Sequence, residues 1–141
     1  MTRPLHHASF RRRTGALLYD AIAVLTVLYF AGFVPVLVAG EAIPPGNPLL
    51  GVYMSVVAFM YFALCWRRGR TLGMQAWGIQ IQTTSGARPT LWTCALRYLA
   101  AWVSFACLGL GYLSALLNRE RLTWHDRLSG TRLLRAGASG S

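Results

Sequence analysis

Residues 14–39, TGALLYDAIAVLTVLYFAGFVPVLVA, decide the fold of this chain. A helix that crosses a membrane needs about 20 predominantly apolar residues, and this run is longer than that and carries a single charge, at Asp20. Placing an aspartate near the centre of such a helix costs roughly 2.5–3.5 kcal/mol, so its carboxylate is expected to face other protein or water and to have a partner. Asp20 is therefore the first candidate functional residue.

The composition of the whole chain also predicts a membrane protein. Of its 141 residues, 55% are hydrophobic and only 13% are charged, which is more apolar than a soluble domain of this size. We expect one small domain, divided into a basic N-terminal arm at residues 1–13, a transmembrane domain at residues 14–135 and a flexible tail at residues 136–141.

The charged residues are strongly unbalanced. Fourteen basic residues, all of them arginine, stand against four acids and give a formal net charge of +10. Such a charge can indicate nucleic-acid binding, because phosphates need basic partners. Here the arginines flank apolar runs, where they hold helix ends at the membrane interface, and none of the DNA-reading motifs is present. The expected partner is the lipid bilayer, with anionic lipids at the arginine clusters and no nucleic acid.

The arginine clusters also predict an orientation. A loop rich in proline and glycine at residues 40–48 contains no arginine, and a second apolar run follows at residues 49–66. Three arginines then fall within residues 67–70. Because cytoplasmic loops carry the excess of positive charge, we expect the loop outside and the N-terminus in the cytoplasm. Residues 78–83 alternate apolar and polar side chains, which predicts a short strand at the cytoplasmic surface.

The third apolar region, residues 91–117, admits two topologies. Residues 98–118 are long enough for a single span, but the C-terminal tail, with five arginines in residues 119–135, would then lie outside, against the charge bias. Alternatively, Gly109 and Gly111 break the region into a re-entrant helical hairpin. The tail would then stay inside, where residues 131–134 can pair with the strand at residues 79–82. We favour the hairpin.

The predicted fold is thus an all-α membrane protein. It is a small helical bundle with three apolar regions, of which two are spanning helices and the third is a single span or a re-entrant helical hairpin, and it has a short cytoplasmic β element.

Arg13 and Asp20 share one face of the first helix. Seven residues make nearly two turns and about 10 Å of rise, so the two side chains are too far apart to touch directly. A third group or a water molecule should connect them. The structural alternative is a buried polar network that only pins one helix against another.

Asp126 is the second acid that stands out, between His125 and Arg127 in the stretch TWHDRLSGT at residues 123–131. A carboxylate here can be a local helix cap. Alternatively, it belongs to a charged cluster at the cytoplasmic mouth of the bundle, where opposite charges reduce the cost of burying one another. That cluster would contain Asp126, Asp20, Arg13 and Arg97. A lone arginine such as Arg97 can also extend to the membrane interface instead.

Taken together, these features resemble the RDD family of small bacterial membrane proteins. They are Arg13 and Asp20, the segment GRTLG at residues 69–73 with GIQI at residues 78–81, Arg97, and HDRLSGT at residues 125–131. The family is named for one arginine and two aspartates, which correspond here to Arg13, Asp20 and Asp126, with Arg12 as an adjacent candidate for the arginine. The resemblance covers residues 11–135. One departure is that Gly73 is followed by methionine and glutamine, where many relatives carry a lysine.

The resemblance implies an integral protein of the bacterial cytoplasmic membrane that is involved in transport. We expect translocation of an ion or small solute through the buried Arg/Asp site, with Asp20 binding and releasing a proton or cation. The site residues would be Arg13, Asp20, Asp126 and Arg97, supported by Arg12, His125 and Arg127. Transport would need a homo-oligomer, because the few short apolar segments of one chain cannot easily enclose a path. The alternative is a non-transporting accessory or scaffold subunit, which would hold a membrane partner subunit.

Catalysis is not expected, because the sequence has none of the nucleophile, metalloprotease or phosphate-loop motifs. Three cysteines without a C-x-x-C pair predict neither a disulfide framework nor a zinc site. No cofactor and no metal are expected.

Overall fold

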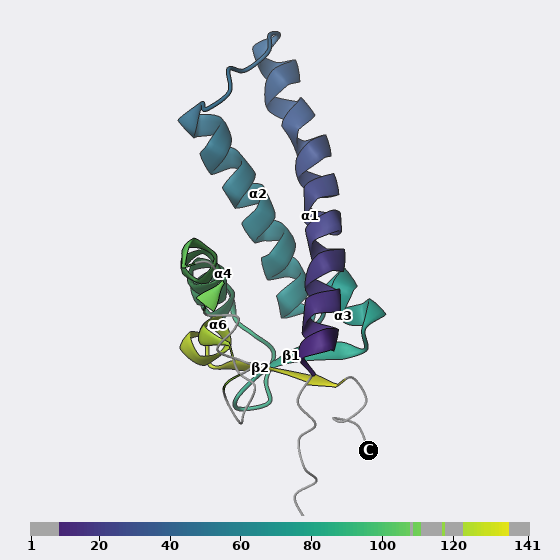
Figure 1. Cartoon of the computed structure of the whole chain (residues 1–141). Helices are drawn as coiled ribbons and strands as arrows, with labels where there is room; N and C mark the ends of the chain where they lie inside the picture. The colour runs from purple at the N-terminus through teal and green to yellow at the C-terminus, as the bar shows by residue number, and fades with distance from the viewer. Residues whose placement is uncertain (1–8, 108, 111–116, 118–122, 136–141) are drawn as a thin grey trace, which may run out of the picture.

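A computed structural model describes residues 9–107, 109–110, 117 and 123–135 of the chain. Two long helices form a hairpin, and the remaining elements gather at its open end (Figure 1). The fold is mostly helical with one small sheet, as predicted. The elements are α1 (Phe10–Ala39), α2 (Pro48–Arg67), α3 (Leu72–Ala76), β1 (Ile79–Thr83), α4 (Leu91–Ala106), α6 (Trp124–Leu128) and β2 (Thr131–Arg135).

The helices of the hairpin begin and end at clear local signals. Helix α1 ends at Gly40, whose φ of 71° permits its N–H to donate to the carbonyl oxygen of Val36. Helix α2 begins at Asn47, whose side chain accepts from the backbone N–H groups of Leu49 and Leu50. Helix α1 starts at Phe10, so it includes the last arginines of the predicted N-terminal arm, of which residues 1–8 lie outside the described residues.

Both hairpin helices are long and apolar enough to cross a membrane. None of the most hydrophobic 18-residue window of α1 is buried inside the protein, and only 11% of the corresponding window of α2 is buried. A core helix of a soluble protein would instead be mostly covered. The apolar side chains of α1 and α2 therefore face outward, as helices surrounded by lipid do.

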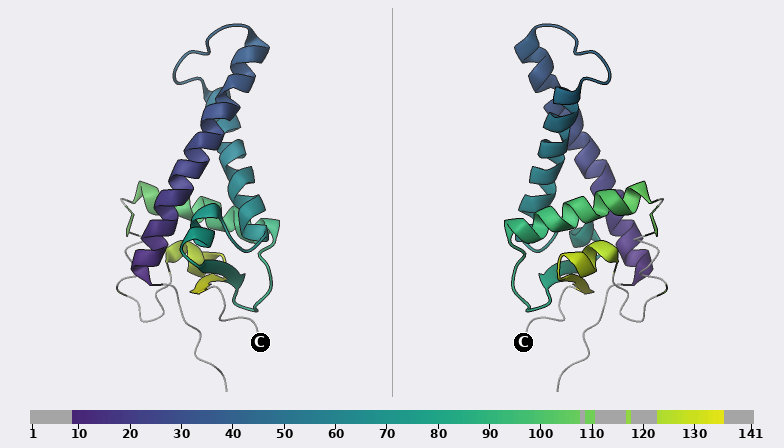
Figure 2. Two further views of the ribbon diagram at one scale, coloured as in Figure 1. Left: turned by 90° about the vertical axis from the view of Figure 1, so that its right-hand side faces the viewer. Right: turned by 90° about the vertical axis from the view of Figure 1, so that its left-hand side faces the viewer.

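Helix α4 is not a third spanning helix. Its 16 residues make about 24 Å of helix, which is short of a full crossing. Figure 2 shows that α4 crosses the hairpin helices near their base instead of running beside them. The predicted break after it is present, because α4 ends at Ala106 and Gly109 has a φ of 76°. Gly111 and the rest of the predicted second arm lie outside the described residues.

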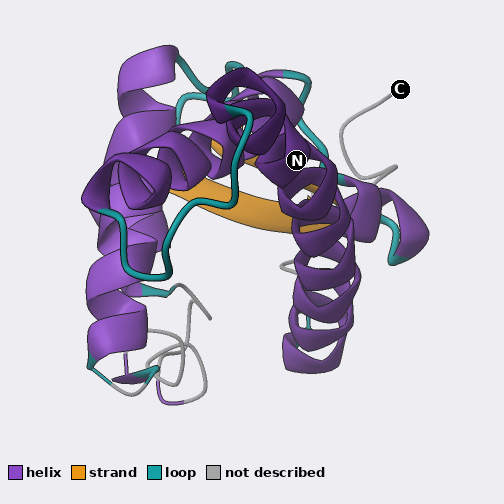
Figure 3. Cartoon of the chain, turned by 90° about the horizontal axis from the view of Figure 1, so that it is seen from above, coloured by secondary structure: helices purple, strands orange, loops and turns teal. Residues whose placement is uncertain are grey.

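The two strands pair as predicted. Strands β1 and β2 are antiparallel, with Ile79 opposite Arg135 and Thr83 opposite Thr131. Seen from above, they run beneath and between the helices (Figure 3). Paired strands must lie on the same side of a membrane, whereas a single span between them would place them on opposite sides. The pairing of these described strands fits the hairpin alternative for the third apolar region and does not fit the single span.

The hydrophobic core lies at the junction of the hairpin with the sheet. It contains Ala16, Ala63, Trp66, Met74, Ile79, Ile81, Cys94 and Leu133. Burial raises the pKa of the Cys94 thiol, so this cysteine stays protonated and acts as a small core side chain. The core thus joins segments from across the chain at the end of the hairpin where all the described arginines lie.

Candidate functional site

Asp126 lies at the centre of a buried ionic network. Its side chain is fully buried, and one carboxylate oxygen, Oδ2, accepts a hydrogen bond of 2.7 Å from Nη1 of Arg13. The other oxygen, Oδ1, accepts from Nη1 of Arg97. Arg13 comes from the first turns of α1 and Arg97 from the middle of α4, so one carboxylate ties two distant helices together.

The start of α6 holds Asp126 in place. Its Oδ2 also accepts from the backbone N–H of Thr123 at 3.2 Å, and the Thr123 hydroxyl accepts from the backbone N–H of Asp126 at 3.4 Å. This reciprocal arrangement is a capping box. The same carboxylate therefore caps α6 locally and pairs with two arginines from other helices.

Arg97 is fixed from several sides. Its Nη1 also donates to the hydroxyl of Thr131 at 2.9 Å, at the start of β2. Its guanidinium carbon lies 5.2 Å from the centre of the Trp66 ring, in a cation–π contact with α2. Arg97 is 4% exposed, so it is a buried member of the site and does not extend to the surface.

Asp20 has a separate set of partners. Its Oδ2 accepts from the hydroxyl of Thr71 at 2.5 Å, and its Oδ1 accepts from the backbone N–H of Gly73 at 2.9 Å. The Thr71 hydroxyl in turn caps α3 by accepting from the backbone N–H of Met74. Asp20 therefore holds α3 against α1. These contacts are those of a buried polar network that fixes one helix against another, which was the structural alternative for Asp20.

This pinning depends on very close packing between α3 and α1. A Cβ atom added at Gly73 would lie 2.0 Å from the carbonyl oxygen of Ala16. Only glycine allows the α3 backbone to come near enough for its N–H to reach Asp20.

The four predicted cluster residues are thus only partly brought together. Arg13, Arg97 and Asp126 meet directly, whereas the two ion pairs among the described residues do not include Asp20. Within the described residues the two side chains have different partners, since Asp20 bonds to Thr71 and Gly73 whereas Arg13 bonds to Asp126. The prediction of a single four-residue cluster was wrong in this respect.

The supporting residues have different positions. Arg12 donates from Nη1 to the carbonyl oxygen of Trp77 at 2.6 Å, so it ties α1 to the end of α3. Arg127 is exposed. The side chain of His125 lies outside the described residues.

Sequence reasoning missed the neutral residues of the site. Thr71 and Gly73 were noted only within the segment at residues 69–73 and not as partners of Asp20, and Thr131 was not noted as a partner of Arg97. The spacing Thr-x-x-Asp at residues 123–126 was a usable signal for the capping box. Nothing local in the sequence indicates the other contacts.

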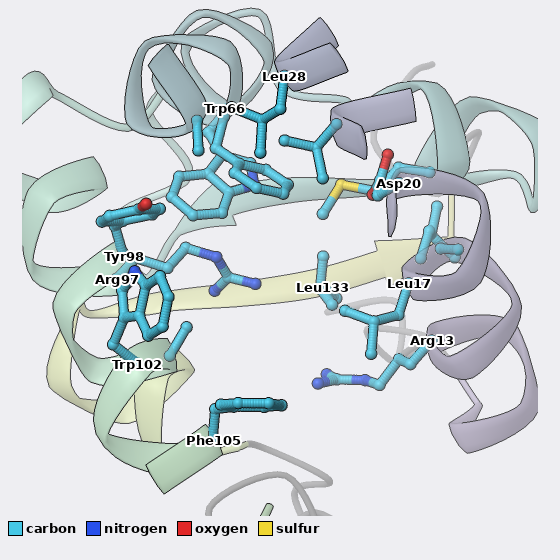
Figure 4. A pocket seen from close by; sticks show the side chains of 17 residues that line it. Arg13, Leu17, Asp20, Leu28, Trp66, Arg97, Tyr98, Trp102, Phe105 and Leu133 are labelled. Atoms are coloured by element: carbon cyan, nitrogen blue, oxygen red, sulfur yellow. The ribbon is translucent and has the colours of Figure 1, made fainter. Parts of the chain in front are cut away.

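A cavity of about 400 Å³ lies above this network (Figure 4). Most of its lining is apolar. From α1 it is lined by Arg13, Ala16, Leu17, Asp20, Val24 and Leu28, and from the other elements by Ala58, Phe62, Trp66, Met74, Ile79, Arg97, Tyr98, Ala101, Trp102, Phe105 and Leu133. Figure 4 shows Arg13 and Arg97 extending into the cavity from opposite walls, toward one another. Its size is within the range of small-molecule binding sites.

The two arginines retain unused hydrogen-bond donors. Nε and Nη2 of Arg13 and Nε of Arg97 are buried and have no hydrogen-bond partner in the part of the chain that the structure describes. Arg13 is only 3% exposed, so bulk water has little access to hydrogen-bond with its unpaired N–H groups. Buried donors of charged groups are normally paired, because leaving them unpaired costs free energy. The site therefore has capacity for a further acceptor.

The described residues contain no group of three or more histidine, cysteine, aspartate or glutamate side chains that could hold a metal ion. The chemistry of the site is that of guanidinium, carboxylate and hydroxyl groups facing an apolar cavity.

Comparison with known families gives one match. The model of the family described as the RDD family matches residues 7–130. The comparisons with curated proteins and with solved structures find no match.

Proposed function

The chain belongs to the RDD family, whose members are membrane proteins, and from this premise we propose that it is a multi-pass transport protein that binds an anionic substrate at Arg13, Arg97 and Asp126. One observation carries the proposal. Two buried guanidinium groups that face one cavity share a single carboxylate and keep unpaired donors.

The charge of this site favours an anion over a cation. Two guanidinium groups and one carboxylate leave one positive charge in a buried position. Such a charge is costly unless a group of opposite sign pairs with it. Arginine also suits carboxylates and phosphates, because its planar fork donates two parallel hydrogen bonds.

Asp20 supports the site in another way. It lines the same cavity, about 10 Å along α1 from Arg13, and both of its oxygens already accept hydrogen bonds. We therefore propose that Asp20 holds the cavity wall together and repels anions that pass the arginines, in place of the cation-binding role expected from the sequence.

Binding and movement of a substrate, and not catalysis, fit the described residues. The site contains arginine, aspartate and threonine side chains but no nucleophile paired with a base.

The arrangement of the arginines supports a two-span topology in the bacterial cytoplasmic membrane. All the described arginines lie at the end of the hairpin opposite the loop at residues 40–47. By the charge bias of membrane loops, this end faces the cytoplasm together with the N-terminus.

Reporter fusions test this topology. Alkaline phosphatase inserted at Pro45 should be active, because that loop lies outside, whereas green fluorescent protein fused after Arg135 should fluoresce, because the tail lies inside. A fusion at Ser85, in the turn after β1, is the matched control and should behave like the fusion after Arg135, since β1 and β2 pair. Phosphatase activity after Arg135 would contradict the proposal.

Transport is tested in proteoliposomes. We expect the protein to accelerate movement of at least one anion from a panel of phosphate, chloride, acetate and a labelled anionic phospholipid. Arg97→Gln should lower the rate by about tenfold or more, because a charge-assisted contact to the substrate is lost. Arg88→Gln, at an exposed arginine, is the control and should leave the rate unchanged.

Flux of protons or sodium ions should be measured in parallel. A cation flux that Asp20→Asn abolishes and Arg97→Gln leaves intact would refute the anion proposal. It would instead support Asp20 as the residue that binds and releases the transported cation.

Two apolar helices cannot enclose a path across a membrane by themselves. We propose that the outward apolar faces of α1 and α2 meet a second copy of the chain or a membrane partner subunit. The same faces favour the alternative role of accessory subunit. Crosslinking followed by mass spectrometry separates the two, since a stoichiometric foreign subunit without any anion flux would favour the accessory role.

A further inference from the structure

We propose that the cavity holds an anionic phospholipid of the cytoplasmic leaflet, with its phosphate on Arg13 and Arg97 and an acyl chain along the apolar wall. This inference rests on the proposed function in one respect, namely that the site binds an anion, and it names the substrate class.

The polarity of the cavity matches an amphiphile. Polar donors gather at one end, where Arg13 and Arg97 face each other (Figure 4). The rest of the wall is apolar and aromatic apart from Asp20, whose two oxygens accept hydrogen bonds from Thr71 and Gly73. A small inorganic anion would use the arginines but would leave the apolar part empty. A ligand with a charged head and a hydrocarbon chain satisfies both parts.

The length of the cavity matches one leaflet. Its lining on α1 extends from Arg13 to Leu28, which is 15 residues or about 22 Å of helix. A bilayer with its headgroup regions is about 40–45 Å thick, so one leaflet measures about 20–22 Å. With Arg13 at the headgroup level, Leu28 lies near the bilayer midplane.

The position of α4 fits the same arrangement. This helix crosses the hairpin near its base, and it places Tyr98, Trp102 and Phe105 on the cavity. On its outer surface it exposes Trp92, Leu99 and Val103. Helices that lie in the plane of the membrane interface carry aromatic and aliphatic residues in this way. The helix that supplies Arg97 therefore lies at the depth of lipid headgroups.

The charge at the site selects among lipids. A phosphate monoanion restores neutrality to two guanidinium groups and one carboxylate. It also accepts hydrogen bonds from the unpaired Nε and Nη2 donors of Arg13. A zwitterionic lipid brings an ammonium group along with its phosphate and gains less at a positive site. Preference for an anionic headgroup is thus the specific expectation.

The experiment measures thermal stabilisation of the purified full-length protein in mild detergent. Dioctanoyl phosphatidylglycerol should raise the melting temperature in a saturable way, because a ligand that binds the folded state stabilises it. Its apparent Kd should be about tenfold lower than that of dioctanoyl phosphatidylcholine, since one charged contact distinguishes the lipids. Inorganic phosphate, which lacks the chain, should give no comparable shift.

Two variants locate the effect. Arg13→Gln leaves Asp126 paired with Arg97, so the protein should still fold, while the preference for phosphatidylglycerol should be lost. Ala101→Trp fills part of the cavity from α4, one helical turn after Arg97, and should also abolish stabilisation by lipid. Ala106→Trp, at the exposed end of the same helix, is its matched control and should bind as the unmodified protein does.

Equal stabilisation by both lipids, or unchanged binding in Ala101→Trp, would overturn the lipid assignment. The experiments distinguish failure of the lipid-site proposal from failure of the transport proposal. Anion flux together with stabilisation by phosphate alone would refute the lipid site and keep the transport proposal. Stabilisation by phosphatidylglycerol with no flux of any anion would refute transport and keep the lipid site.

Discussion

Asp126→Asn is expected to destabilise the folded protein by about 3–5 kcal/mol, the usual cost of removing one partner from a buried ion pair. The fully buried carboxylate is the shared counter-ion of Arg13 and Arg97, so its loss leaves two guanidinium groups facing each other without compensation. The measurement is the fraction of protein that remains monodisperse in detergent after a series of heating steps.

The matched comparison is with the arginines. Arg13→Gln or Arg97→Gln leaves one arginine paired with one aspartate, so either change should cost clearly less than Asp126→Asn. Glu41→Gln alters an exposed acid in the loop and should change stability by no more than about 0.5 kcal/mol. If removing either arginine lowers stability more than removing Asp126 does, then Asp126 is not the essential counter-ion of the two arginines and the prediction is wrong.

Gly73→Ala is expected to be the second most damaging change. The new methyl group would lie 2.0 Å from the carbonyl oxygen of Ala16, an atom of the α1 backbone that cannot rotate away. Helix α3 must then move outward, which costs about 1–3 kcal/mol for overpacking and also breaks the hydrogen bond from the Gly73 N–H to Asp20. The same heating assay detects the loss.

Gly51→Ala is the control for this prediction. Gly51 lies within α2 with no atom near the added methyl group, so the substitution should leave stability unchanged or raise it by up to about 1 kcal/mol through helix propensity. If Gly73→Ala is tolerated as well as Gly51→Ala, then α3 does not pack against α1 at the distance that the structure gives.

The two aspartates of the family name therefore have different roles. Asp126 balances charge between α1 and α4, whereas Asp20 accepts hydrogen bonds that hold α3 against α1. The arginine at position 13 joins the first of these systems, and its neighbour Arg12 joins α1 to Trp77. Loss of either aspartate should impair the protein, but by separate routes.

Local sequence determined the two long helices and the first strand of this protein, but not the short helices α3 and α6. Hydropathy over residues 14–39 and 49–66 indicated the two long helices, and alternation over residues 78–83 indicated strand β1, because these signals depend on side chains a few positions apart. The distribution of arginines also pointed to a tail on the same side as β1, which the pairing of β1 with β2 agrees with.

Tertiary structure alone decided which charges meet. Arg13 and Asp126 are 113 residues apart, and Asp20 and Gly73 are 53 apart, so no local pattern links them. The seven-residue spacing of Arg13 and Asp20 correctly placed them on one helix face, but it could not reveal that α3 reaches Asp20 while α6 supplies a different acid to Arg13. Long-range contacts of this kind follow from how α3, α4 and α6 pack against the base of the hairpin, and that packing is set by the whole chain at once.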